Sequence, residues 1–229
     1  MTTTRVAQWA TGSTGRHALA AVIDLPALEL VGVRVYNPAK VGVDAGALAG
    51  RAPTGVLATD NTTELLTARP EVVLYMGAVE THPDECFADV AGLLESGIDV
   101  IATGSSFIDV SAFDPARAAV LEAACQRGGS SFLGVGMFPG FWGEAVAPLL
   151  SRLSAGCSTI TVRESLSYAG YPSRELLVDV MGYGQPPQSA APLLSDPARA
   201  RVRSPLRPVC WRARWGSNSV RSNRSGRRR

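Results

Sequence analysis

The chain has 229 residues, of which 46% are hydrophobic and 18% are charged, a composition typical of a soluble globular protein that can bury a core. It shows neither a basic segment followed by an apolar run at the N-terminus nor an uninterrupted apolar stretch later, so we expect no signal peptide and no membrane span. The four cysteines have no CxxC spacing, which favours a reduced, cytoplasmic location.

The net charge of +2 conceals an uneven distribution. Residues 1–196 carry 11 basic residues against 20 acidic ones, a net charge of −9, whereas residues 197–229 carry 11 arginines and no acid. These last residues also lack any hydrophobic periodicity. We therefore expect an arginine-rich, disordered tail whose function is separate from that of the rest of the chain.

Six short apolar segments alternate with helical patterns in the first 135 residues. Strongly apolar segments of this length are typical of strands that helices cover on both faces. The alternation predicts an α/β fold built on a doubly wound parallel sheet. The predicted strands are Val6–Ala10, Leu28–Tyr36, Gly55–Thr59, Glu71–Met76, Ile98–Ala102 and Ser131–Val135.

The segments between the strands carry apolar stripes at helical spacing and residues that begin or end helices. After the first strand, the stripe consists of Ala18, Leu19, Val22 and Ile23. The other predicted helices run from an Asp60 cap to about Ala68, over Pro83–Ser96 with Gly97 as the terminator, from Asp114-Pro115 to about Arg127, and over Pro139–Leu153 with a kink or break at Pro148.

The run ATGSTG, residues Ala10 to Gly15, lies between the first strand and its helix. In the pattern GxGxxG the first glycine makes a tight turn, the second lets the backbone approach a pyrophosphate, and the third permits close helix–strand packing. Alanine can replace the first glycine if its φ stays negative. We interpret Gly12, Ser13, Thr14 and Gly15 as a pyrophosphate cradle, and the alternative is that these glycines serve only tight packing.

The end of the second strand predicts which dinucleotide binds. NAD-binding folds usually carry a carboxylate there for the ribose 2′-hydroxyl, but none lies between Glu29 and Asp44. The segment offers Arg34, Tyr36, Asn37 and Lys40 instead. Because such groups accept a 2′-phosphate, NADP is the predicted cofactor and NAD the second choice. The alternative is that Arg34 and Lys40 are solvated surface charges.

Two further turns are expected to line the nicotinamide side. Gly77-Ala78 follows the fourth strand and Thr103-Gly104-Ser105 follows the fifth. Ligands of doubly wound sheets bind outside the carboxyl ends of the strands, which is where these residues fall. For Gly77, an ordinary turn glycine is an equal alternative.

The sequence does not assign a catalytic residue. His82, Glu144 and Glu164 are the residues considered, and an ordinary loop, helix or strand role is favoured for each. His17 lies on the first helix. No HExxH motif, cysteine cluster or set of carboxylates with ligand spacing is present, so we expect no metal.

Beyond residue 153 the pattern changes. Thr159–Tyr168 alternates with period two, as the first strand of a second sheet would, and Ser173–Met181 is typical of a helix capped by Ser173. An exposed edge of that sheet predicts association of two copies or aggregation. We divide the chain into a dinucleotide-binding domain (1–153), a partial substrate and dimerisation domain (154–196) and the tail (197–229).

Four stretches resemble the dihydrodipicolinate reductase-like oxidoreductases, in particular the actinobacterial branch related to 2,4-diaminopentanoate and amine dehydrogenases. They are QWATGSTGRHAL, LELVGVRVYNPAKVGVDAGALAG, GVGMFPGFWGE and VRESLSYAGYPSRELLVDVMGYGQPP, which together cover residues 5 to about 187. The resemblance implies an NAD(P)-binding Rossmann domain followed by an α+β domain that binds substrate. It also implies that Gly12–Gly15 hold the pyrophosphate, with Arg34, Asn37 and Lys40 near the adenosine ribose.

The chain departs from the family in two ways. It lacks the double histidine and the following lysine of true dihydrodipicolinate reductases, and the family's second domain continues well beyond the MGYG stretch, so we expect a truncated or frameshifted C-terminus. The resemblance implies hydride transfer to or from a C=N or C–N carbon of an amino acid, amine or imine. The alternatives are a dinucleotide-binding module without catalysis and a nucleic-acid binder that uses the arginine-rich tail.

Overall fold

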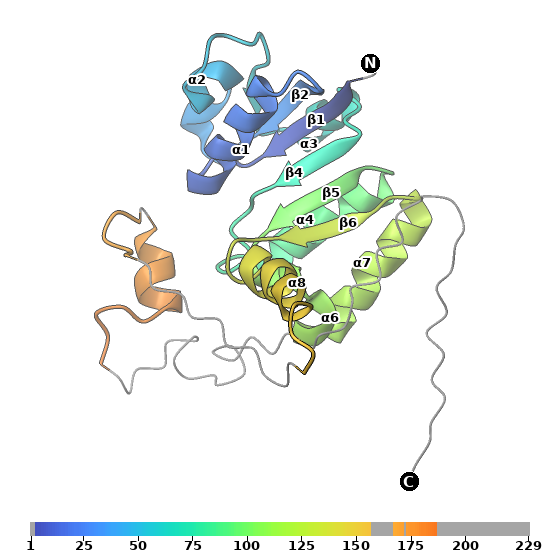
Figure 1. The fold of residues 1–229 in the computed structure, drawn as a ribbon. Helices are drawn as coiled ribbons and strands as arrows, with labels where there is room; N and C mark the ends of the chain where they lie inside the picture. The colour runs from blue at the N-terminus through green and yellow to red at the C-terminus, as the bar shows by residue number, and fades with distance from the viewer. Residues whose placement is uncertain (1–2, 157–166, 172, 187–229) are drawn as a thin grey trace.

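A six-stranded parallel sheet forms the centre of the molecule (Figure 1). The computed structural model describes residues 3–156, 167–171 and 173–186. The strand order is β3-β2-β1-β4-β5-β6, and all neighbouring strands run parallel. The predicted doubly wound parallel sheet is therefore confirmed, and each strand overlaps its predicted segment. The strands are β1 Thr4–Trp9, β2 Leu28–Arg34, β3 Ala58–Thr59, β4 Val72–Tyr75, β5 Asp99–Thr103 and β6 Phe132–Val135.

Two separate apolar clusters show that helices cover both faces of this sheet. In the smaller cluster, Leu19 of α1 (Ser13–Asp24) packs with Val33 of β2 and with Ala45 of α2 (Ala45–Ala49). The larger cluster joins α4 (Pro83–Glu95) and α7 (Pro115–Gly128) to β1, β4 and β5. The chain thus changes faces between β1 and β4, which is the point at which doubly wound sheets open a crevice.

Most predicted helix ends are confirmed. Asp114 accepts hydrogen bonds from the first-turn N–H groups of Ala116 and Arg117, both at 3.1 Å, and the helical segment after β6 changes from η2 (Phe141–Val146) to α8 (Ala147–Ser151) next to Pro148. Asp60 as a cap is wrong: α3 (Thr62–Thr67) begins one residue later than expected, so Asn61 is the residue whose side chain reaches the free N–H groups.

Several short helices were not predicted from the sequence, because four or five residues are too few to show a helical period. One of them is α2, whose cap Asp44 accepts a hydrogen bond from Gly46 N at 2.7 Å. The others are η1 (Pro38–Lys40), α5 (Ser105–Ile108) and α6 (Val110–Phe113), whereas η3 (Leu176–Val180) falls within the predicted helix Ser173–Met181.

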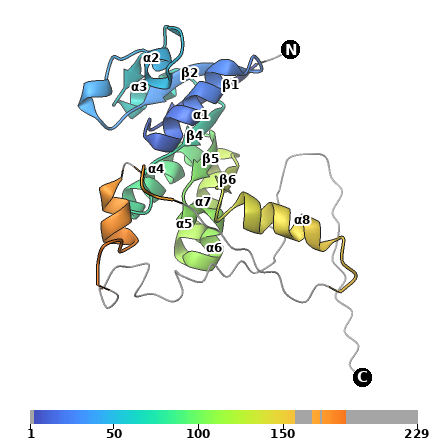
Figure 2. The same cartoon turned by 60° about the vertical axis from the view of Figure 1, so that its left-hand side comes forward.

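The region after β6 carries much exposed apolar surface. Figure 2 shows α8 extending away from the sheet, and Leu149, Leu150 and Leu153 in and after it are exposed. The helix predicted at Ser173 is confirmed in η3, where Leu176 N donates to Ser173 Oγ at 3.2 Å. Most of the predicted strand Thr159–Tyr168, including Glu164, and the arginine-rich tail lie outside the described residues.

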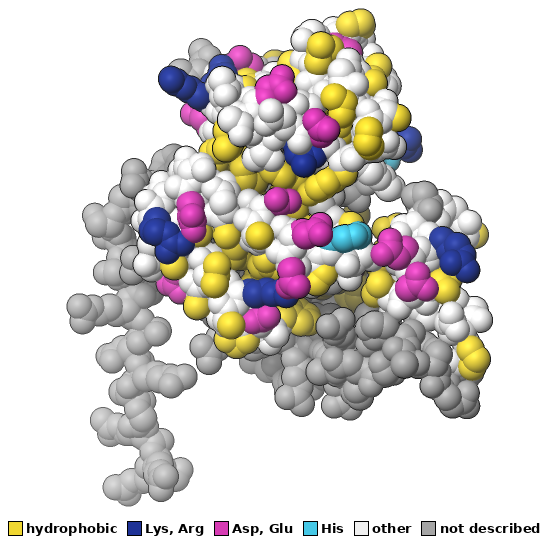
Figure 3. Space-filling model, turned by 180° about the vertical axis from the view of Figure 1, so that it is seen from behind, with side chains coloured by type: hydrophobic (Ala, Val, Ile, Leu, Met, Phe, Trp, Pro, Cys, Tyr) yellow, Lys and Arg dark blue, Asp and Glu magenta, His cyan; other side chains and the backbone are white. Residues whose placement is uncertain are grey.

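On the face seen in Figure 3, the described residues show acidic and basic side chains scattered among apolar ones. Over the ranges that the structure describes, no helix is both long and apolar enough to cross a membrane.

Two glycines of the α4–α7 pair make a matched test of the packing. A Cβ added to Gly128 would lie 1.9 Å from the Leu94 carbonyl oxygen, whereas one added to Gly92 would meet nothing within 4 Å. We expect Gly128→Ala to lower the free energy of unfolding by about 1–3 kcal/mol. Gly92→Ala, within a helix, should raise it by about 0.5–1 kcal/mol. Urea denaturation measures both, and similar effects at the two sites would contradict the described contact.

Candidate functional site

The turn between β1 and α1 places Ala10 in the left-handed region, with φ +68°. Alanine therefore does not meet the condition of a negative φ at this position, because the chain must turn sharply from the end of the strand to the start of the helix. This conformation costs a residue with a Cβ about 1–2 kcal/mol. Two hydrogen bonds hold it: Ala10 N donates to the Arg34 carbonyl, and Gln8 Nε2 donates to the Ala10 carbonyl, both at 2.9 Å.

The two glycines of the run have different surroundings. Gly15 is buried, and a Cβ there would lie 2.1 Å from the Ala10 carbonyl oxygen, so it serves close helix–strand packing. Gly12, the N-cap of α1, is exposed, and a Cβ there would meet nothing within 4 Å. Packing therefore explains Gly15 but leaves Gly12 unexplained.

The N-terminus of α1 is open to solvent. Gly12, Ser13 and Thr14 are all exposed, and no side chain caps the helix. The first N–H groups of a helix have no partner within it, and they coincide with the positive end of the helix dipole. The turn thus presents donors and positive potential toward the outside.

Lys40 is joined to this turn, although it lies far from it in sequence. Its Nζ donates to the carbonyl oxygen of Thr11 at 2.9 Å and to Thr11 Oγ1 at 3.1 Å. Asn37 is exposed and caps η1, accepting a hydrogen bond from Ala39 N at 2.9 Å. The short helix after β2 therefore brings the lysine next to the open end of α1.

Arg34 is held inside a stack of aromatic rings. Its guanidinium carbon lies 5.4 Å from the centre of the Trp9 ring and 4.8 Å from that of Tyr36. It also donates to the Val35 carbonyl, and its buried Nε has no partner among the described residues. Arg34 is therefore not a solvated surface charge. Its guanidinium group and the Tyr36 ring together form a flat surface.

A carboxylate that the sequence did not indicate, Asp89 of α4, lies beside these rings. The hydroxyls of Tyr36 and Tyr75 each donate to Asp89 Oδ2 at 3.0 Å, and Trp9 Nε1 donates to Tyr36 Oη at 2.8 Å. Burial raises the pKa of the Tyr75 hydroxyl. Partial burial also raises the pKa of the Tyr36 hydroxyl. The network connects β1, β4, α4 and the end of β2 at the point where the chain changes faces.

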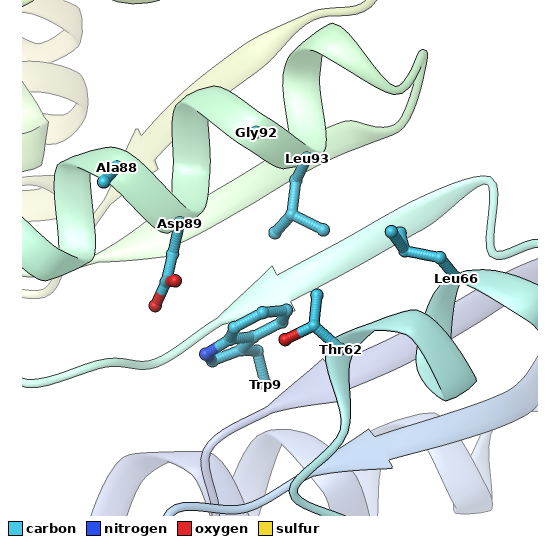
Figure 4. A pocket seen from close by; sticks show the side chains of 7 residues that line it. All are labelled: Trp9, Thr62, Leu66, Ala88, Asp89, Gly92 and Leu93. Atoms are coloured by element: carbon cyan, nitrogen blue, oxygen red, sulfur yellow. The ribbon is translucent and has the colours of Figure 1, made fainter.

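A cavity of about 220 Å³ opens between α3 and α4 on the same face (Figure 4). Trp9 lies on its sheet side and Asp89 projects toward the indole from α4, as Figure 4 shows. Its wall is mainly apolar. The lining residues are Trp9, Thr62, Leu66, Ala88, Asp89, Gly92 and Leu93.

The residues predicted for the nicotinamide side lie together at the carboxyl ends of β4 and β5. Gly77 is buried, and a Cβ there would lie 2.6 Å from the Tyr75 hydroxyl; Gly104 has φ +136°. Thr103 Oγ1 donates to Met76 Sδ at 3.0 Å, and Ala78 is exposed. Packing against Tyr75 thus accounts for Gly77.

Glu80, which the sequence did not single out, also lies at this edge. Its Oε1 accepts hydrogen bonds from Ser105 N at 2.8 Å and Ser105 Oγ at 3.2 Å. His82 Nδ1 is 2.7 Å from Thr81 Oγ1, at the start of α4, while His17 is exposed on α1. Within the described ranges, no group of three or more His, Cys, Asp and Glu could hold a metal ion.

Comparison with known proteins shows similarity to an amine dehydrogenase. An amine dehydrogenase from Streptomyces virginiae is 38% identical over 181 residues, which are 78% of this chain and 50% of that protein. The chain is therefore a homologue of an amine dehydrogenase over those residues, and it spans half the length of that relative. The resemblance that the sequence motifs indicated is confirmed. No family model matches the chain.

Comparison with solved structures shows a shared fold in one amine dehydrogenase. Amine dehydrogenase from Mycobacterium smegmatis superimposes with a TM-score of 0.58 and 21% identity, covering 67% of this chain and 45% of that one. A dipicolinate-bound dihydrodipicolinate reductase from Paenisporosarcina sp. TG-14 gives a TM-score of 0.45 and 18% identity, covering 65% and 50%.

The buried Tyr75 hydroxyl predicts how stability depends on alkaline pH. An unfolded tyrosine ionises near pH 10, whereas burial raises the folded-state pKa, so this group's contribution is full below about pH 10 and declines as the pH rises further. Between about pH 9 and pH 11, we expect the melting temperature of Tyr75→Phe to fall less than that of the wild type. Parallel melting curves for the two proteins would contradict the burial of this hydroxyl.

Proposed function

We propose that this homologue of an amine dehydrogenase binds a nicotinamide dinucleotide at the carboxyl edge of its sheet, with the pyrophosphate at Gly12, Ser13 and Thr14. The observation that carries the proposal is the open, uncapped N-terminus of α1, held close to the sheet through the buried Gly15. Backbone N–H groups at a helix N-terminus bind phosphate in this way. A side chain at Gly12 would occupy the space through which the phosphate approaches.

We place the adenosine ribose near Arg34, Asn37 and Lys40 and prefer NADP(H) over NAD(H). Lys40 supports this choice, because its ammonium group already lies at the rim of the cradle and can exchange Thr11 for a phosphate oxygen. The stacked Arg34 and Tyr36 offer a flat surface for a base or its phosphate, since guanidinium groups and aromatic rings stack on planar groups.

The proposed reaction is hydride transfer to or from a C=N or C–N carbon of an amine, amino acid or imine. A bound nicotinamide supplies the hydride chemistry. Gly77, Ala78, Thr103 and Gly104 would line the ring, and their close-packed turns would exclude water. An amine is proposed as substrate because the Streptomyces relative is an amine dehydrogenase, although this chain spans only half of that protein.

In this proposal residues 1–153 form the dinucleotide-binding domain, and residues 154–196 contribute to substrate binding and to association of subunits. The exposed Leu149, Leu150 and Leu153 are an apolar surface next to that second region. Turnover of a panel of amines and amino acids with NADP+ tests the activity. Binding of the dinucleotide without any turnover would identify the chain as a binding module.

Gly12→Ala tests the cradle itself. Gly12 has φ −73° and open space around it, so alanine should leave the melting temperature nearly unchanged. We expect the variant to bind NADPH at least about tenfold more weakly, a loss of about 1.4 kcal/mol, in a fluorescence titration. Gly170→Ala, another glycine with nothing within 4 Å, is the control. Wild-type protein that binds neither NADPH nor NADH, or unchanged binding by Gly12→Ala, would overturn the proposed site.

Lys40→Gln tests the choice of dinucleotide. Because hydrogen bonds to charged groups contribute about 1.5–3 kcal/mol, the dissociation constant for NADPH should rise about tenfold or more, with a smaller change for NADH. The control is Arg51→Gln, which removes a cation that pairs with Asp24 at the far end of α1. Equal weakening of NADPH and NADH by Lys40→Gln would show that the lysine does not read the 2′-phosphate.

A further inference from the structure

A fully buried glutamine lies directly beneath the cradle. Gln8 of β1 has no exposed surface, and its Nε2 donates to the Trp9 carbonyl at 3.2 Å and to the Ala10 carbonyl at 2.9 Å. A Cβ added to Gly15 would lie 3.2 Å from this nitrogen. The amide is therefore packed between the central strand and the first turn of α1.

The position of the Ala10 carbonyl explains why an amide is useful there. The left-handed turn brings this oxygen close to Gly15, where the helix packs tightly against the strand, and Ala10 as a whole is buried. A buried carbonyl without a partner costs about 1–3 kcal/mol. Gln8 Nε2 is the side-chain donor that the described structure gives to this oxygen.

The same amide also has an unfavourable side. Gln8 Oε1 is buried and has no partner among the described residues. An apolar side chain of similar size would remove this unpaired acceptor, so for stability alone the glutamine offers little advantage over an apolar residue. Its advantage must lie in the geometry of the turn, where alanine occupies the position that favours glycine.

We propose that Gln8 is a positioning residue of the dinucleotide site: its amide fixes the Ala10 carbonyl and so holds Ala10 in the left-handed turn that opens the N-terminus of α1. This inference rests on the proposed dinucleotide function. It predicts a specific coupling, because glycine adopts a positive φ without strain and should make the glutamine unnecessary.

The test is a double-mutant cycle on the full chain with Gln8→Met, an unbranched apolar replacement, and Ala10→Gly. NADPH binding is followed by fluorescence and folding by thermal melting. We expect Gln8→Met to weaken NADPH binding about fivefold to tenfold, in line with the loss of a buried hydrogen bond. In the Ala10→Gly background, Gln8→Met should change NADPH affinity by less than about threefold, so that most of the loss seen in the wild-type background is absent.

Gln8→Leu repeats the cycle should the methionine variant fold poorly. A double variant that binds as weakly as Gln8→Met, or Gln8→Met with wild-type affinity, would overturn the inference. If Gln8 has only a structural role, Gln8→Met would lower the melting temperature, and Ala10→Gly would not restore NADPH binding in the double variant. If the wild type binds no dinucleotide, the proposed function fails, and the melting temperatures of the same four proteins still decide whether Gln8 and Ala10 are coupled.

Discussion

The close contact between the Ala10 carbonyl and the Cα of Gly15 is the constraint on which the site depends. It brings the first turn of α1 against the end of β1. The contact requires glycine at residue 15, a left-handed residue at position 10 and a donor for the buried carbonyl. Each of the three requirements is met by a different residue of the same short segment.

The fold was predictable because its signals are local. Central parallel strands are apolar runs, and long helices show their period and their caps, as Asp114 and Pro115 do for α7. The short helices α2, α5 and α6 escaped prediction, since four or five residues give no period. The φ of Ala10 could not be read from the residue type, because the strand-to-helix turn imposes a positive φ on an alanine.

The site was predictable only in part, for the same reason. Gly12 and Lys40 were identified from a motif and from the absence of a carboxylate, both of which can be read from consecutive residues. Asp89 and Glu80 were missed because their partners, Tyr36 and Ser105, lie 53 and 25 residues away. The position of Asp89 within the turn of α4 places it on the side that faces the sheet. The residues next to Asp89 in sequence do not indicate this.

The hydrogen bonds beneath the cradle determine which groups remain to recognise a ligand. The hydroxyls of Tyr36 and Tyr75 are engaged with Asp89, and Arg34 is stacked between rings, so this floor is rigid. Lys40 is different, because it holds Thr11 through two bonds to neutral oxygens. A phosphate oxygen carries charge and forms the stronger bond with an ammonium group. In the proposed dinucleotide site, recognition would therefore rely on backbone N–H groups already in place and on one lysine that exchanges partners.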